Sequence, residues 1–98
     1  MGVSNKGLAY LLLRRKPVML LIRLLRADKP IYASIVAKDI DCTYSHTVRI
    51  LQELKKREIV SFEKKGRLKL ITLTKKGREI AECLERLVSM LNKADHSK

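Results

Sequence analysis

A run of basic side chains in the second half of the sequence is the feature best suited to binding chemistry. Residues 55–78 hold ten Lys and Arg residues against Glu58 and Glu63, a local charge of +8. The whole chain of 98 residues has a formal net charge of +12. Positive charge of this size attracts a polyanion, and nucleic acid and an anionic membrane surface are the two main candidates. The simpler interpretation is a basic protein that uses its charge for solubility.

Groups that could catalyse a reaction or bind a metal are not arranged in a recognisable pattern. The sequence contains no paired-carboxylate site, no Cys/His constellation, no phosphate-cradling glycine loop and no metal-ligand spacing. Cys42 and Cys83 stand alone without a CxxC pair, so we interpret them as two reduced thiols rather than as a redox sensor. We therefore expect no enzymatic activity, no metal and no cofactor.

A helix is predicted over about residues 44–56, where the basic run begins. Its apolar stripe consists of Val48, Leu51 and Leu54. Thr43 or Ser45 can cap its N-terminus, because a hydroxyl there accepts a hydrogen bond from a free backbone N–H. The opposite stripe is polar and consists of Ser45, His46, Arg49, Gln52, Glu53 and Lys56.

A hairpin is predicted directly after this helix, over about residues 60–72. Val60 and Phe62 alternate with polar residues, and the same period of two resumes after "KKGR". Gly66 marks the tip, since glycine adopts the positive φ that tight hairpins need. Thr74 then caps a long amphipathic helix. The glycine in the first turn of that helix, at position 77, would be explained by the close approach of another backbone.

Four further elements are predicted in the first half of the chain. Residues 5–15 form a short helix that is apolar on more than one face, and a second helix runs over about 17–27. The inner face of the second helix consists of Val18, Leu21, Ile22 and Leu25. Residues 31–32 form a very short strand. A compact helix follows it, with Ile35 and Val36 turned inward.

These elements predict one domain, mainly α with a small β-hairpin. The N-terminal helix covers 5–15, the core 17–73 and the C-terminal helix 74–93. Two short helices joined by a tight turn, then a two-stranded hairpin, form the layout of a winged helix-turn-helix. In that layout the helix over 44–56 can enter a DNA major groove, while the hairpin tip reaches the flanking backbone or minor groove.

Two stretches resemble a known family, the MarR-type winged-helix regulators and the shorter archaeal winged-helix proteins related to them. "SHTVRILQELKKREIV" is similar to the recognition helix and its exit into the wing, and "ITLTKKGREI" to the junction after the second wing strand. The resemblance covers about residues 17–84. By position it implies DNA contacts from the recognition helix and the wing. The candidate DNA-binding residues are Thr43, Tyr44, Ser45, His46, Arg49, Lys56, Lys64, Lys65, Gly66 and Arg67.

The sequence departs from the family pattern in two places. The hairpin tip is much shorter than a typical MarR wing. Only one helix follows the wing, whereas larger members use additional C-terminal helices to dimerise and to enclose an effector pocket. Control by a small-molecule effector is therefore not carried over to this chain, and any such effector is unknown.

For three side chains of the predicted recognition helix, the sequence leaves more than one interpretation open. Arg49 can bond bidentately to guanine or simply neutralise a phosphate. His46 can donate a hydrogen bond to a base or phosphate, or it can be an ordinary exposed histidine. Tyr44 packs at the turn or touches a phosphate rather than stacking on a base.

The C-terminal helix is predicted to pair with a second copy of the chain. Ile80, Leu84, Leu87 and Leu91 follow one another at coiled-coil spacing. Packing of this seam back onto its own domain is the alternative. The apolar first helix also needs a partner, so the predicted dimerisation residues are Leu8, Leu11, Leu12, Ile80, Leu84, Leu87 and Leu91. A symmetric dimer would place two reading helices about one DNA turn apart.

The leading functional hypothesis is a dimeric, sequence-specific double-stranded DNA-binding protein, a transcriptional regulator. A chromatin or architectural protein of low specificity is the first alternative. A winged-helix module that binds protein or structured RNA is the second. No apolar run is long enough to cross a bilayer, so we expect a cytoplasmic, nucleoid-associated protein.

Overall fold

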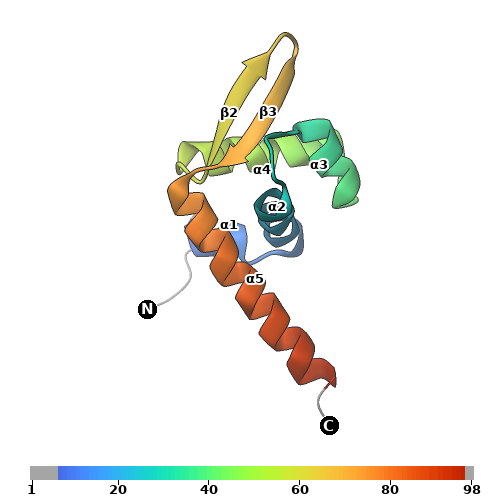
Figure 1. The fold of residues 1–98 in the computed structure, drawn as a ribbon, viewed down its shortest axis with the longest axis vertical. Helices are drawn as coiled ribbons and strands as arrows, with labels where there is room; N and C mark the ends of the chain where they lie inside the picture. Colours follow the sequence, from blue (N-terminus) through green and yellow to red (C-terminus); the bar gives the residue numbers. More distant parts are fainter. Residues whose placement is uncertain (1–6, 97–98) are drawn as a thin grey trace.

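A computed structural model describes residues 7–96 of the chain (Figure 1). Helices and a small antiparallel sheet follow one another in the predicted order, which confirms the mainly α fold with a hairpin. The elements are α1 (Leu8–Leu12), α2 (Arg15–Arg26), β1 (Ile31–Tyr32), α3 (Ala33–Asp39), α4 (Tyr44–Lys56), β2 (Val60–Lys65), β3 (Leu68–Leu73) and α5 (Lys75–His96). The first helix is shorter than predicted, and residues 5 and 6 of that prediction lie outside the described range.

The sheet has the strand order β1-β3-β2, and both pairings are antiparallel. We call the β2–β3 hairpin, residues 60–73, the wing; it projects from one end of the molecule (Figure 1). Lys65 pairs with Leu68 across a two-residue loop of Gly66 and Arg67. Gly66 has φ +62° and is the only one of these two residues with a positive φ, as in a type II′ turn. The predicted hairpin and its glycine tip are confirmed.

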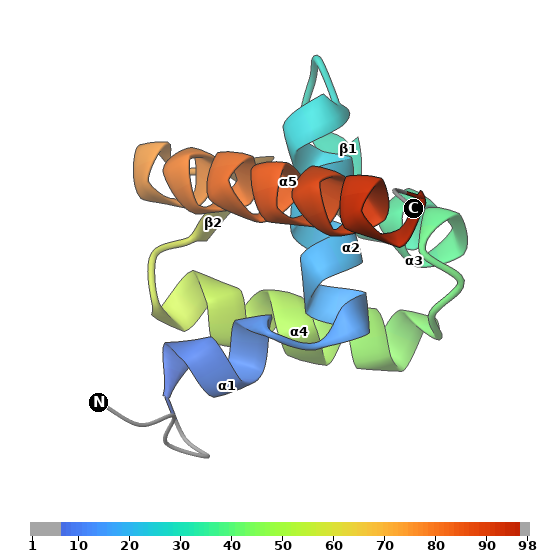
Figure 2. The same ribbon diagram turned by 90° about the horizontal axis from the view of Figure 1, so that it is seen from below.

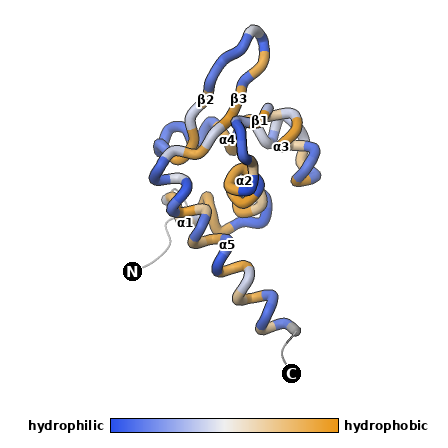
Figure 3. The backbone as a smooth tube through the Cα atoms, in the orientation of Figure 1, coloured by the Kyte–Doolittle hydropathy of each residue, from blue (hydrophilic) through white to orange (hydrophobic). Residues whose placement is uncertain are grey.

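Helix α2 occupies the centre of the molecule, between α4 on one side and α5 on the other (Figure 2). Most of it is hydrophobic, in contrast to the hydrophilic β2 arm of the wing (Figure 3). Leu20 and Leu21 are fully buried there, together with Leu51 and Leu54 of α4 and Ile71 of β3. The core thus joins the helix-turn-helix, the base of the wing and the first half of α5 into one unit.

The buried face of α2 differs from the predicted one. Its buried residues are Pro17, Leu20, Leu21 and Leu24. The predicted Val18, Ile22 and Leu25 are only partly buried. Because α2 is apolar around most of its circumference, helical spacing alone did not determine which stripe faces the core.

The buried stripes of α3 and α4 both follow i, i+3, i+4, i+7 spacing. The α3 stripe is Ala33, Val36, Ala37 and Ile40, and the α4 stripe is Thr47, Ile50, Leu51 and Leu54. The α3 spacing leaves Ile35 outside, 44% exposed, so its predicted inward orientation is wrong. In α4, Val48 is only partly buried, whereas Leu51 and Leu54 lie inside as predicted.

Thr43 caps α4. Its Oγ1 accepts a hydrogen bond from the backbone N–H of His46 at 3.2 Å. The buried hydroxyl of Thr47 donates to the carbonyl oxygen of Thr43 at 2.9 Å, so the one buried polar side chain of α4 has a hydrogen-bond partner. Of the two predicted caps, Thr43 is the one used, which leaves Ser45 exposed on the outer face of the helix.

The wing and α5 are joined to the end of α4 at one junction. Thr74 Oγ1 accepts from the backbone N–H of Gly77 at 3.0 Å and donates to the carbonyl oxygen of Glu58 at 2.6 Å. The backbone N–H of Thr74 donates to the carbonyl oxygen of Ile59 at 3.1 Å. A Cβ at position 77 would overlap that same carbonyl oxygen, so the predicted close approach of a backbone to Gly77 is confirmed.

Candidate nucleic-acid interface

The outer face of α4 carries the polar stripe that the sequence predicts for a recognition helix. Its exposed members are Ser45, His46, Arg49, Gln52 and Lys56. Ser45, Arg49, Gln52 and Lys56 lie opposite the buried stripe, about half a turn of the helix away, and His46 lies at the edge of this face. Tyr44, in the first turn, is 55% exposed. The face therefore offers hydroxyl, amide, imidazole, guanidinium and ammonium groups to a partner.

One edge of this face borders a hollow beside the start of α2. His46, Arg49 and the partly buried Glu53 line it from α4. The facing wall consists of Leu11, Arg14, Arg15, Lys16 and Pro17. These basic residues of the α1–α2 segment were not among the predicted site residues, because the sequence separates them from α4 by about 30 positions.

Lys16 connects α2 to the turn between α3 and α4 through hydrogen bonds. Its Nζ donates to the carbonyl oxygens of Ile40 and Asp41, both at 2.7 Å. Asp41 has φ +54°, a left-handed conformation that costs an L-residue about 1 kcal/mol or more. Ile40 and Asp41 directly follow α3, so the ammonium group also lies near the negative end of that helix and interacts favourably with it. Lys16 is thus a positioning residue for α4.

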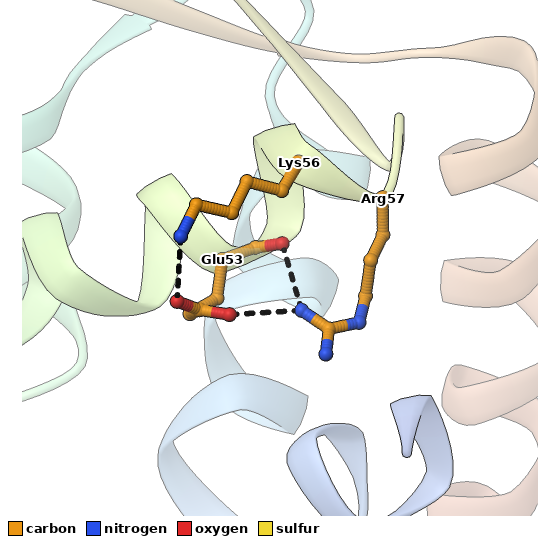
Figure 4. A network of polar contacts seen from close by, with 3 residues as sticks. All are labelled: Glu53, Lys56 and Arg57. Carbon is orange, nitrogen blue, oxygen red and sulfur yellow. Dashed lines mark hydrogen bonds and ion pairs between the residues drawn. The ribbon is translucent and has the colours of Figure 1, made fainter. Parts of the chain in front are cut away.

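Glu53 forms a small network on the same edge of α4 (Figure 4). Its carboxylate accepts from Arg57 Nη1 at 2.9 Å and from Lys56 Nζ at 3.4 Å. The hydrogen bond from Arg57 is the largest cause of a lowered pKa of Glu53, followed by the charge of Lys56. The one acidic side chain on the outer half of α4 is therefore engaged by cations of its own helix.

The predicted wing residues lie apart from the α4 group, at the far end of the hairpin. Lys64, Lys65, Gly66 and Arg67 are all exposed at or beside the tip. Leu68, which was not predicted, is also 52% exposed there. The candidate site therefore has two separate parts, the outer face of α4 and the wing tip (Figure 1).

The predicted dimerisation residues divide into a buried and an exposed set. Leu12 and Leu84 are 5% and 8% exposed and belong to the core of their own chain. Leu8, Leu11 and Ile80 pack against that core and are partly buried. Leu87 and Leu91 are 44% and 58% exposed on the far half of α5. The first half of the seam thus packs onto its own chain, and its second half is exposed, so pairing of the seam with a second copy stays a prediction.

An apolar groove runs beside the exposed leucines. It lies between α5 and the segment that links α1 to α2, and it is lined mainly by Leu13, Val18, Met19, Leu84, Leu87, Val88 and Leu91. Leu13 is 60% exposed at its edge. Apolar surface of this kind, left open on one chain, is typical of an interaction site.

Within residues 7–96, no group of three or more His, Cys, Asp or Glu side chains is close enough to hold a metal ion. Cys42 is partly buried and Cys83 is exposed, and both are free thiols. None of the helices in that range combines the length and apolar character needed to cross a membrane.

Comparison with known proteins rests on structure. No family model and no curated protein matches the sequence. A MarR family transcriptional regulator from a Rhodococcus species superposes with a TM-score of 0.81 at 23% identity, over 95% of this chain and 67% of that one. This chain has the MarR-type winged-helix fold.

Other solved structures that match differ in how much of their length the chain spans. A protein from Archaeoglobus fulgidus matches with a TM-score of 0.77 at 23% identity, over 87% of this chain and 97% of that one. MepR of Staphylococcus aureus, solved as a DNA complex, matches with a TM-score of 0.71 at 16% identity, over 90% and 74%. The chain covers only 59% of the MarR regulator from Silicibacter pomeroyi. The chain thus spans nearly the full length of the Archaeoglobus fulgidus protein but only part of the other two.

Proposed function

We propose that this protein binds double-stranded DNA as a homodimer and regulates transcription. The observation that carries the proposal is the outer face of α4, where Ser45, Arg49 and Lys56 are exposed on a MarR-type fold beside a basic wing. A helix of this width fits the major groove, and the wing tip at Lys65 and Arg67 then reaches the flanking backbone. MepR, which shares the fold, is known in complex with DNA.

Affinity and specificity would come from different side chains. Lys56, Lys64, Lys65 and Arg67 supply charge that releases counterions from the DNA backbone. Arg49 lies at the centre of the exposed face and is the best placed to read a guanine edge, with Ser45 and His46 one turn before it. Thr43, as the cap, fixes the first turn of the helix rather than reading a base.

Dimerisation is proposed through the apolar groove and the exposed leucines of α5. Leu87, Met90 and Leu91 are large apolar side chains that a monomer would leave in water. A second copy of the chain, related by a two-fold axis, would cover them with the same surface. The dimer would also hold two α4 helices at one spacing, which a paired DNA site requires.

The test is a fluorescence-anisotropy titration of a random duplex and of a duplex selected from genomic fragments, across a salt series. A site-specific regulator should prefer the selected duplex about a thousandfold or more. Arg49→Ala should erode that preference about tenfold, because a bidentate base contact contributes about 1–3 kcal/mol. Arg67→Ala should weaken binding to both duplexes equally and lower the salt dependence.

Other outcomes favour other functions. Equal and steeply salt-dependent binding to both duplexes would indicate an architectural protein of low specificity. Absence of binding near physiological salt would contradict the DNA proposal and favour a module that binds protein or structured RNA. Either DNA function places the protein in the cytoplasm with the nucleoid, and fractionation with chromosomal DNA would check that location.

A further inference from the structure

A second hollow borders the outer face of α4 on the side of the wing. It is lined by Gln52, Lys55, Lys56, Phe62 and Lys69, and we call it the wing hollow. Phe62 is the one apolar residue of this lining. The ammonium nitrogen of Lys55 lies 5.0 Å from the centroid of the Phe62 ring, and that of Lys69 lies 5.3 Å from it. One aromatic ring in β2 therefore holds two cations that come from α4 and β3.

The strand register concentrates positive charge on this side of the wing. Val60 pairs with Leu73, Phe62 with Ile71 and Lys64 with Lys69, so these side chains share the face that continues from the core. Glu63 alternates onto the opposite face. The inner face thus changes along its length from aliphatic to aromatic to basic, and the acidic residue of the wing lies on its other side.

This arrangement works against the stability of the free protein. Like charges directly opposite each other on neighbouring strands are destabilising, and Lys64 and Lys69 form such a pair. Among the described residues, neither Lys55 nor Lys69 forms an ion pair with a carboxylate. Of the three lysines that line the hollow, Lys56 is paired with Glu53, whereas Lys55 and Lys69 have no carboxylate partner among the described residues. An anion from outside the chain would therefore be stabilised between Lys55 and Lys69.

We propose that the wing hollow is a phosphate clamp, in which Lys55 and Lys69 bind a phosphodiester of the DNA strand that passes between α4 and the wing. Phe62 acts as a positioning residue, because cation–π attraction holds both lysines over its ring before DNA arrives. Gln52 donates an amide hydrogen bond from the helix side of the hollow. The inference rests on the proposed function and adds to it a site that base reading does not require.

The clamp predicts that affinity lost from this hollow is salt-dependent and independent of sequence. The probe is a random-sequence duplex, titrated by anisotropy across a salt series with the full chain. Lys55→Gln and Lys69→Gln together should lower the slope of log affinity against log salt by about 1, since the one phosphate that they neutralise contributes about 0.9. Lys29→Gln with Lys93→Gln removes the same charge from exposed positions outside the hollow and should leave the slope nearly unchanged.

Two further measurements distinguish a role of these side chains in DNA binding from a role in stabilising the fold. Phe62→Leu keeps every charge and should weaken binding about threefold at low salt, as expected for the loss of cation–π contacts. Lys69→Gln relieves the repulsion with Lys64, so its thermal midpoint should equal or exceed that of the parent. A lysine with only a structural role would instead lower the midpoint when replaced.

The outcomes distinguish the two proposals. Suppose that the parent binds the duplex and the Lys55/Lys69 double variant has the parent's slope of log affinity against log salt, or a slope reduced no more than in the Lys29/Lys93 control. The clamp is then overturned, and the DNA-binding proposal stands. Unchanged affinity of Phe62→Leu overturns the positioning role of the ring. If the parent itself shows no salt-dependent binding, the proposed function fails first.

Discussion

The wing and the far half of α5 both project from the core, but they expose opposite kinds of side chain. The molecule measures 51 × 29 × 26 Å, and these two projections extend from its opposite ends (Figure 1). The wing exposes Lys64, Lys65 and Arg67 near its tip, whereas α5 exposes Leu87 and Leu91. Each is unfavourable for an isolated chain, since the first concentrates like charges and the second leaves apolar surface in water.

The contrast indicates two partners of different chemistry. A polyanion would relieve the charge on the wing, and its contribution would fall steeply with salt. An apolar surface would cover the leucines of α5, and that contact would change little with salt. The two projections can therefore be tested separately, because each should respond to conditions that leave the other unaffected.

The largest expected effect concerns α5. Leu87→Glu with Leu91→Glu should weaken dimerisation about 100-fold, since each leucine contributes about 1.5 kcal/mol when buried and a charge opposes burial. Analytical ultracentrifugation across a concentration series measures this shift. Ser89→Glu with Asn92→Glu adds the same charge away from the groove and should leave the dimer intact. Equal behaviour of both variants would show that the groove is not the dimer interface.

The next largest effect is expected at the junction of Thr74 and Gly77, which joins the wing and α5 to the end of α4. Gly77→Ala should lower the free energy of unfolding by about 2 kcal/mol, because a clash with the Ile59 carbonyl costs about 3 kcal/mol and the helix gains only about 1 kcal/mol from alanine. Gly66→Ala meets no neighbouring atom but has to adopt φ +62°, so it should cost about 1 kcal/mol. Urea denaturation compares the two glycines. A larger loss at Gly66 would contradict the packing at Thr74 and Gly77.

Lys16 tests whether the position of α4 depends on the hydrogen bonds between α2 and the α3–α4 turn. Lys16→Met removes both hydrogen bonds to the α3–α4 turn and should lower the free energy of unfolding by about 1 kcal/mol. Lys29→Met, at an exposed position on the α2–β1 loop, should change it by less than about 0.5 kcal/mol. Equal values for the two variants in thermal denaturation would mean that these hydrogen bonds do not position α4.

The smallest effect is the pH dependence from Glu53. Its lowered pKa means that the folded state binds the proton less tightly than the unfolded state, so its ion pairs stabilise the fold above pH 4.5. That contribution is lost as the pH falls through the lowered pKa. The stability difference between parent and Glu53→Gln should thus be present at neutral pH and vanish in acid. A difference that persists in acid would point to a cause other than charge.

The order of elements was predictable because each has a local signal. The polar cap Thr43, the change of period after α4 and the glycine of the wing tip all lie within a few residues of the structure they determine. Which stripe of α2 is buried was not predictable, because Leu20 and Leu24 compete with Val18, Ile22 and Leu25 around an almost wholly apolar helix. Packing against the helices on either side of α2 determines which stripe is buried, and no local sequence pattern indicates that packing.

The candidate site was predictable in part for the same reason. Arg49 and its neighbours follow from one helical stripe, and Lys65 and Arg67 from their place beside the turn. The contacts of Lys16 span 24 and 25 residues, and the ring of Phe62 collects lysines from two other elements. Such contacts depend on the packing of separate elements. Counting back from Gly66, the alternation of side chains along a strand places Lys64 on the same face as Phe62. This was the one feature of the sequence that indicated the wing hollow.

The carbonyl group of Ile59 has a consequence for the geometry of the proposed dimer. It accepts from Thr74 at 3.1 Å and is in close contact with Gly77, so the end of α4 and the start of α5 share one rigid pivot. Helix α5 has 22 residues and extends about 33 Å from that pivot. A rotation of about 5° there would displace its far end by about 3 Å, close to the rise of one base pair. Because the first half of α5 also packs in the core, the stiffness of that packing and of the Ile59 peptide group together would set the tolerance of the proposed dimer for the spacing of two DNA half-sites.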